Sequence, residues 1–418
     1  MQTFTLVFLI ALLLTTLTKL WLAARHVRHI QAHRNAVPQE FSEQIALDAH
    51  QKAADYSSTK TRLSFIQITL DAALLLAFTL GGGLQILSHF WSTIFDAGIW
   101  HSMALIISPI LIISILEFPL NIYHTFVVEA RFGFNKMTPA LFIVDIFKQL
   151  LLASLFGLPF LAGVLWLMDK MGENWWLYVW FAWMGFNLLV LAIYPTFIAP
   201  FFNKFTPMED LQLKSRIEQF LKKCGFKAEG LFVMDGSKRS SHGNAYFTGF
   251  GKSKRIVFFD TLLTHLTHDE IEAVLAHELG HFKRRHIIKR IVWTFIMSLG
   301  FLWLLGWLMN KTWFYEGLGV PPDMQSTGMA LILFFMVIPA FTFLFQPLSS
   351  FYSRKHEFEA DQYAAQNANA NDMVQALVKL YKDNASTLTP DPLHSVFYDS
   401  HPPAATRIAR LQNAGHNT

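Results

Sequence analysis

The sequence predicts a mainly α-helical, polytopic membrane protein with about seven transmembrane helices and a small α+β lobe outside the bilayer. Apolar residues make up 53% of the 418 residues and charged residues only 15%, a balance typical of bilayer proteins. Several uncharged runs approach the roughly 20 residues that cross about 30 Å of hydrocarbon as a helix. Two long polar segments cannot enter lipid and should form lobes in water.

Seven stretches have the length and composition of a membrane span. They are Thr3–Ala24, Leu63–Ile86, Met103–Ile122, Leu150–Met168, Trp176–Phe197, Ile291–Met309 and Gly328–Leu348. Composition alone leaves open an apolar soluble protein, because 40 Phe and 12 Trp residues could fill a large core, but the lengths of the uncharged runs favour a bilayer. The first stretch is predicted to be retained rather than cleaved as a signal peptide, since its basic residues follow the apolar run.

The spans and polar segments divide the chain into four predicted parts. These are an N-terminal membrane domain with five spans (1–202), a polar lobe (203–290), spans six and seven (291–349) and a C-terminal lobe (350–418). Lys and Arg cluster after the first and third spans but are missing from 87–102, so the positive-inside rule places both lobes in the cytoplasm. The net charge of +4 fits such loops, and no nucleic-acid partner is expected.

The polar insert between the fifth and sixth spans predicts a small sheet followed by a helix. Segments 230–235, 244–250 and 255–260 resemble short strands, and the turn-prone 251–254 joins the last two. Thr267 and Glu270 form a capping-box pattern directly before an apolar run. A helix is therefore predicted to begin there and continue through the following histidines.

This predicted helix carries His277-Glu278-Leu-Gly-His281, an H-E-x-x-H sequence. The four-residue spacing puts both imidazoles on one helical face, where each can give a ring nitrogen to one Zn²⁺. Glu278 is turned roughly 100° from His277, so it can approach the attacking water without binding the metal. The sequence predicts one zinc ion per chain and Glu278 as general base. A single cysteine excludes a cysteine zinc cage and an intrachain disulfide.

A hydrolytic zinc site usually takes three protein ligands, so one more must come from elsewhere. The metzincin third histidine is missing, and His286, one residue away from that position, is expected to be a solvated helix residue. Glu316 lies one span later, on the opposite side of the membrane. Glu357 and Asp361 follow two spans and share a helical face, so one can bind zinc while the other receives a ligand imidazole N–H. Glu359 is expected to be a surface carboxylate.

Five segments together are more specific than the zinc motif alone. They are 129–135 (Glu-Ala-Arg-Phe-Gly-Phe-Asn), 241–247 (Ser-His-Gly-Asn-Ala-Tyr-Phe), 277–281, 357–361 and 400–407. With them, nearly the whole chain resembles the CAAX prenyl protease 1 family of integral-membrane zinc endopeptidases. The resemblance implies seven spans enclosing a large chamber. It also implies His277, His281 and Glu357 as zinc ligands, with Glu278 activating water and Asp361 orienting a ligand histidine.

The resemblance implies further roles that the residues alone do not. His401 and Arg407 would lie near the scissile carbonyl and help to stabilise the oxyanion. Asn244, Ala245 and Tyr246, at an edge strand, would hold the substrate backbone by β-augmentation. The short linker between the last two spans indicates a reduced polar cap and a bacterial inner-membrane protein; a eukaryotic member would lie in the endoplasmic reticulum. Prenylated proteins are not expected substrates in bacteria, so the natural substrate stays open.

We therefore interpret the chain as a zinc-dependent membrane endopeptidase. Its expected substrates are peptides or proteins that are membrane-associated or lipidated at a CAAX-type C-terminus, and they include prenylated ones. One alternative is a quality-control metalloprotease without prenyl dependence. Another is a transporter or channel in which Asp71 and Glu117 are relay groups and His277 is incidental. A metal-binding scaffold without catalysis is disfavoured because Glu278 is present.

Overall fold

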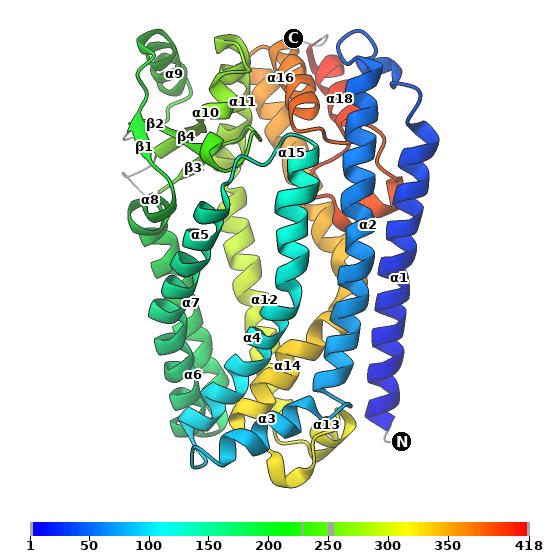
Figure 1. Ribbon diagram of the computed structural model, residues 1–418. Coiled ribbons are helices and arrows are strands. Elements are labelled where there is room, and N and C mark those ends of the chain that lie inside the picture. The colour runs from blue at the N-terminus through cyan, green and yellow to red at the C-terminus, as the bar shows by residue number, and fades with distance from the viewer. Residues whose placement is uncertain (1–2, 228–229, 250–254, 416–418) are drawn as a thin grey trace.

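Long helices run side by side through most of the molecule, and a smaller lobe with a sheet lies at one end of them (Figure 1). This computed structural model describes residues 3–227, 230–249 and 255–415. Helix α1 begins at the end far from the lobe, whereas the chain finishes beside it (Figure 1). An odd number of crossings requires this placement of the two ends.

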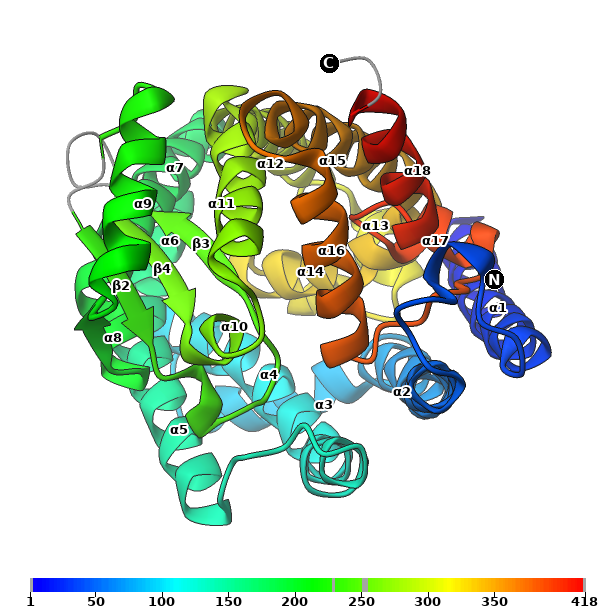
Figure 2. The same ribbon diagram turned by 90° about the horizontal axis from the view of Figure 1, so that it is seen from above.

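Seven helical segments of the described chain are long and apolar enough to cross a membrane, which confirms the predicted number. Their helices are α1 (Thr3–His33), α2 (Leu47–Phe78), α4 (Ile99–Tyr123), α5 (Pro139–Leu152) with α6 (Leu158–Lys170), α7 (Trp175–Ile193) with α8 (Ala199–Phe202), α12 (His286–Leu308) and α14 (Thr327–Thr342). Two short helices, α3 (Gly83–Ser92) and α13 (Thr312–Gly317), lie between spans. Viewed from above, most of the long helices lie around the rim of the molecule (Figure 2).

The fourth span begins at Pro139 rather than at the predicted Leu150. The predicted span is too short because Asp145 and Lys148 interrupt the apolar sequence, and an uncharged run begins only after them. In the structure both charges have partners. Asp145 accepts from Arg239 at 2.7 Å, and the Lys148 ammonium donates to a backbone carbonyl at 2.6 Å. Paired charges of this kind are tolerated at the end of a span.

The lobe is built around a four-stranded sheet in the order β1-β2-β4-β3. The strands are β1 (Phe205–Pro207), β2 (Gly230–Met234), β3 (Ala245–Thr248) and β4 (Arg255–Phe259), and the helices are α9 (Leu211–Lys223), α10 (Asp260–Leu263), α11 (His268–Lys283), α15 (Gln346–Asn367), α16 (Ala370–Asp383), α17 (Pro392–Tyr398) and α18 (Ala404–Gly415). Three strands confirm the predicted sheet, and β1 was missed because it is very short. The predicted turn 251–254 lies outside the described residues.

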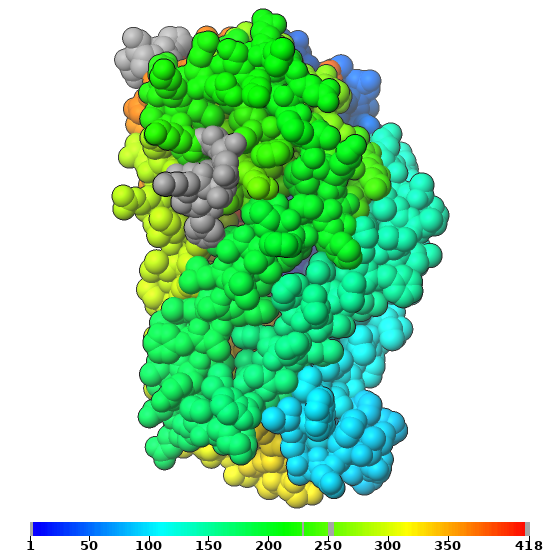
Figure 3. Space-filling model, turned by 90° about the vertical axis from the view of Figure 1, so that its left-hand side faces the viewer, coloured from blue at the N-terminus to red at the C-terminus, as the bar shows by residue number. Residues whose placement is uncertain are grey.

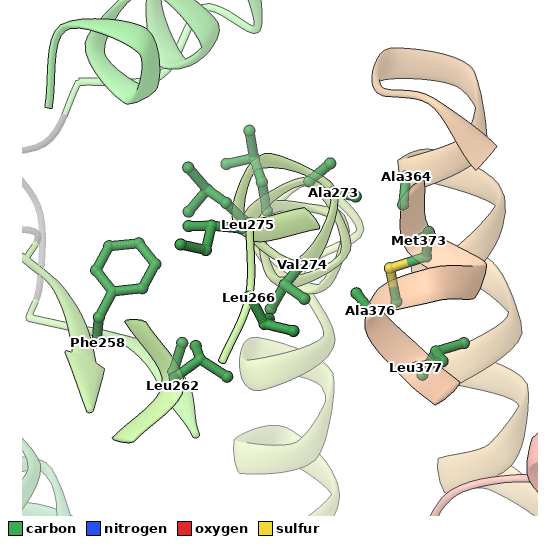
Figure 4. Close-up of a cluster of buried hydrophobic side chains, with 14 of the residues drawn as sticks. Phe258, Leu262, Leu266, Ala273, Val274, Leu275, Ala364, Met373, Ala376 and Leu377 are labelled. Carbon is green, nitrogen blue, oxygen red and sulfur yellow. The ribbon is translucent and has the colours of Figure 1, made fainter. Parts of the chain in front are cut away.

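Helix α11 packs between the sheet and α16, and apolar side chains fill both contacts (Figure 4). Phe258 and Leu262 lie on the sheet side, whereas Met373 and Leu377 of α16 lie on the other (Figure 4). The lobe rests directly on the fourth and fifth spans (Figure 3). A helix covered on both sides in this way holds its side chains in fixed positions.

The connections α1 to α2 and α4 to α5 lie at the same end as both lobes (Figure 1). The basic clusters of the sequence lie in these connections and in the adjoining parts of α1 and α2. Ion pairs join them to the lobes, as between Arg25 and Asp391 at 2.8 Å. Helix α13, which carries Glu316, lies at the opposite end (Figure 1), so the exclusion of Glu316 on topological grounds agrees with the structure.

Candidate metal centre

Helix α11 begins with the predicted capping box. The Thr267 hydroxyl accepts from the Glu270 backbone N–H at 3.4 Å, and the Glu270 carboxylate accepts from the Thr267 N–H at 2.7 Å. The helix ends at Lys283, and Arg285 adopts a left-handed conformation with φ 57°. The H-E-x-x-H sequence therefore lies wholly within one helix, as its spacing required.

Helices α11 and α15 approach each other closely at Gly280. A Cβ built on Gly280 would lie 2.9 Å from the Ala360 Cα, so no larger residue fits there without moving the backbone. This approach brings two histidines of α11 opposite two carboxylates of α15. Small residues at a helix contact thus create the site's geometry.

Three side chains converge as a candidate metal site: His277, His281 and Glu357. The two Nε2 atoms are 3.2 Å apart. The Glu357 oxygens lie 3.4 Å from His277 Nε2 and 3.3 Å from His281 Nε2. Ligand atoms of a tetrahedral zinc ion, each about 2.0–2.2 Å from it, lie about 3.3–3.6 Å apart. Among the described residues, Glu357 Oε2 is also buried without a hydrogen-bond partner. The donor set therefore fits a divalent metal such as zinc.

Asp361 lies one turn beyond Glu357 and contacts the other nitrogen of His277, with 2.9 Å between Asp361 Oδ1 and His277 Nδ1. The buried guanidinium of Arg407 donates to both Asp361 oxygens, at 2.8 and 2.6 Å. Burial alone would lower the pKa of His277, but the neighbouring carboxylates of Asp361 and Glu357 outweigh it and raise that pKa to about 9. The Asp361 contact fixes the ring so that Nε2 faces the other ligands.

Arg407 reaches the site, but most of its donors are occupied. Its Nε and Nη2 bond to Asp361, and Nη1 lies 3.9 Å from Glu357 Oε2. The arrangement supports an orienting contribution through Asp361 in addition to the oxyanion role that the resemblance implies. Without the resemblance, the sequence would indicate only a surface charge at Arg407, because its partner lies 46 positions earlier in the chain.

Glu278 is half-buried on α11, between the two histidines in sequence. Burial raises the pKa of its carboxyl group, and the neighbouring histidines oppose that effect. A carboxylate with a raised pKa is a better proton acceptor at neutral pH. The Glu278 environment therefore suits general-base chemistry.

His401 approaches the site from the segment before α18. Its Nε2 lies 3.4 Å from Glu357 Oε2, and 58% of its side chain is exposed. Partial burial lowers the pKa of His401, so its imidazole is neutral near pH 7. His401 also lines a pocket of about 390 Å³ beside the metal site. A neutral imidazole facing an open space can donate to a bound carbonyl.

Strand β3, with Ala245 and Tyr246, forms one edge of the sheet, because it pairs only with β4 among the described strands. The Asn244 side chain accepts from the Ala245 N–H at 2.8 Å, and its carbonyl accepts from the Phe259 N–H at 2.9 Å. The outer edge of β3 leaves backbone groups available for a further strand.

His286 is not the solvated residue that we expected. Its side chain is 2% exposed, its Nδ1 lies 2.9 Å from His281 Nδ1, and its Nε2 lies 3.0 Å from Glu359. The expectation was wrong because the chain turns at Arg285, which directs His286 back toward α11. Glu359 stays outside the metal group but is linked to His281 through His286, so it is more than a surface carboxylate.

The chain matches two described families over most of its length. Residues 26–204 match the family described as CAAX prenyl protease N-terminal, five membrane helices, and residues 207–414 match peptidase family M48. A curated relative from Arabidopsis thaliana, CAAX prenyl protease 1 homolog, is 35% identical over 90% of both chains. CAAX prenyl protease 1 from Saccharomyces cerevisiae is 34% identical, over 90% of this chain and 88% of that protein.

A solved structure agrees with these similarities. The crystal structure of S. mikatae Ste24p superposes with a TM-score of 0.92 and 31% identity, and the match covers 98% of this chain and 99% of that one. These findings decide between the peptidase and transporter interpretations of the sequence in favour of the peptidase. The chain therefore belongs to the CAAX prenyl protease 1 family, the membrane metallopeptidases of peptidase family M48.

Proposed function

We propose that this membrane metallopeptidase uses zinc and cleaves peptide bonds near the C-terminus of membrane-tethered, CAAX-type substrates. The observation that carries the proposal is the convergence of His277, His281 and Glu357 beside Glu278. Two histidines and one carboxylate form the ligand set of many hydrolytic zinc sites, which keep one position open. The names of the relatives supply the substrate class.

In the proposed reaction each group has a distinct part. His277, His281 and Glu357 would hold a zinc ion, which would supply Lewis-acid polarisation of the substrate carbonyl and lower the pKa of the attacking water. Glu278 accepts the proton of that water and delivers it to the leaving amine. Asp361 keeps the His277 ring in place.

The remaining groups position the substrate. Backbone atoms of β3, beginning after Asn244, hold the peptide as an added strand, with Ala245 and Tyr246 nearest its start. His401 and Arg407 stabilise the negative charge that develops on the carbonyl oxygen. A chamber between the spans admits the tethered end of the substrate, as the family implies.

The proposed location is the bacterial inner membrane, with both lobes in the cytoplasm. The basic residues in and beside the α1–α2 and α4–α5 connections support this orientation, because the cytoplasmic side carries the excess of Lys and Arg. A reporter fused after the C-terminus should be active in the cytoplasm. Activity of such a reporter only outside the cytoplasm would reverse the orientation.

The proposal is tested with the purified protein in detergent and a peptide that ends in farnesylated Cys-a-a-X. Cleavage should stop when the metal is removed with a chelator and return on addition of Zn²⁺, whereas Mg²⁺ should not restore it. The same peptide without the farnesyl group separates the two substrate classes. Equal cleavage of both peptides would favour the quality-control alternative over the CAAX-directed activity.

A further inference from the structure

A polar pocket adjoins the candidate metal centre. Its volume is about 390 Å³. One wall consists of His401 and its neighbours, residues 398–403, a second is one face of α2, and a third is formed by residues between 381 and 390 at the end of α16 and after it. Because His401 lies 3.4 Å from Glu357, a peptide at the metal site is in immediate reach of this pocket.

Lys60 stands on the α2 wall of the pocket. Tyr56, Ser57 and Thr61 line the pocket with it, since these positions share one face of a helix. The Lys60 ammonium lies over the Tyr56 ring, 4.1 Å from its centre, and its side chain is exposed. Among the described residues, no carboxylate is paired with Lys60 within 4.0 Å.

The charge of the Glu129 carboxylate acts on Lys60, but the groups within 4.0 Å of Glu129 are others. It accepts from the Tyr56 hydroxyl at 2.6 Å and faces His242 at 3.7 Å. Asp399, which also lines the pocket, accepts from the Ser395 hydroxyl. Lys60 is therefore left as a cation that faces the pocket without an anionic partner of its own.

Asn384 supplies a second donor to the same pocket. Its side-chain oxygen accepts from the Gly243 backbone N–H at 3.2 Å. A backbone N–H can only donate, so the atom facing it must be Oδ1 and the amide NH₂ is directed elsewhere. Asn384 lines the pocket, and its NH₂ group is the donor left for a ligand.

We propose that Lys60 and Asn384 bind the free α-carboxylate at the C-terminus of the substrate, on the leaving side of the scissile bond. This inference rests on the proposed function. A carboxylate accepts a strong, charge-assisted hydrogen bond from an ammonium group, and its second oxygen can accept from an amide NH₂. A lipid phosphate has similar chemistry, but the pocket shares His401 with the metal centre, where a peptide is cut. The peptidase thereby selects substrates whose chain ends shortly after the cleavage site.

The test compares two farnesylated peptides that differ only in a free or an amidated C-terminus, with the zinc-loaded full-length protein in micelles. The parent should cleave the free acid with a kcat/KM about 10- to 100-fold higher, mainly through KM. Lys60→Gln should cleave both peptides as slowly as the parent cleaves the amide. Lys60→Arg should keep much of the preference. Arg62→Ala is the matched control, because Arg62 is an exposed neighbour that does not line the pocket, and it should behave as the parent.

Equal cleavage of acid and amide by the parent, or an unchanged preference in Lys60→Gln, would overturn the carboxylate site and leave the proposed function standing. Cleavage of neither peptide would instead overturn the proposed function. Fluorescence anisotropy with Glu278→Gln protein then tests the carboxylate site by binding alone. The free acid should bind more tightly than the amide. Equal binding of the two peptides would contradict the carboxylate site. Added phosphatidylglycerol should leave the preference for the free acid unchanged. If the lipid abolishes this preference, Lys60 binds a lipid phosphate instead.

Discussion

Two consecutive helices, α11 in the lobe and α12 in the membrane, differ in how they bury their side chains. In α11 every residue from Ala273 to His277 is buried. In α12 the buried residues are His286, Leu302, Leu305 and Leu308, while Trp293, Ile296 and Trp303 are each 56% exposed. The more apolar helix is the less buried one, because lipid covers it instead of protein.

This difference shows where the sequence is strongly constrained. A lipid-facing position needs only an apolar side chain, whereas a position in α11 must also fit its neighbours in size, charge and hydrogen bonding. Substitutions in the lobe should therefore have large and residue-specific effects, and conservative substitutions on the lipid face of α12 should have small ones.

Glu278→Gln should give the largest effect. The amide keeps the size of the side chain but cannot accept the proton of water, so turnover should fall by at least about 10²–10⁴-fold with zinc content unchanged. Glu272→Gln is the control on the same helix, because Glu272 binds Arg216 at the lobe surface and should leave turnover near the parent's. Parent-like cleavage by zinc-loaded Glu278→Gln protein would exclude Glu278 as the base.

The variants Glu357→Ala and Glu359→Ala should differ in their affinity for zinc. Loss of the Glu357 ligand should weaken binding by more than about 100-fold, since even removal of a residue that only orients a ligand typically reduces affinity about 10–100-fold. Glu359 acts on His281 only through His286, so its loss should weaken binding by about tenfold or less. Competition titration with a zinc indicator measures both. Equal affinities of the two variants would contradict the ligand assignment.

Zinc affinity of the apoprotein should increase with pH, because zinc needs the neutral imidazole of His277 and the pKa of that group is raised to about 9. Below this pKa binding releases the His277 proton, so affinity should rise about tenfold per pH unit and level off above pH 9. Asp361→Asn removes a carboxylate that stabilises the protonated ring, so the plateau should begin at lower pH. If the plateau of zinc affinity begins at the same pH in Asp361→Asn as in the parent, Asp361 does not cause the raised pKa of His277.

Matched glycine substitutions compare the two helices directly. Alanine inside a helix is ordinarily more stable than glycine by about 0.5–1 kcal/mol. Gly300→Ala in α12 should follow that rule, because nothing lies within 4 Å of the new methyl group. Gly280→Ala in α11 should instead destabilise by about 1–3 kcal/mol, because its methyl would meet the Ala360 backbone at 2.9 Å. Thermal unfolding monitored in micelles measures both, and a stabilised Gly280→Ala protein would refute the close approach of α11 and α15.

The number of spans, the start of α11 at Thr267 and the pairing of His277 with His281 could be predicted from the sequence alone. These features depend on local quantities, namely the transfer free energy of a continuous run and the 3.6-residue period of a helix. Topology added the candidates Glu357 and Asp361, since only an even number of spans returns the chain to the same side. At this level the sequence predicted most of the fold and the residues of the metal group.

The way in which these residues meet depends on the tertiary structure. It placed Glu357 against the Nε2 atoms and Asp361 against Nδ1, although both are carboxylates on one helical face. It also brought His286 back to His281, and Lys60 into the same pocket as His401. Such contacts depend on a backbone reversal at Arg285 and on the packing of helices distant in sequence. Neither is encoded in the periodicity of a single segment, because each depends on which surfaces fit together in three dimensions.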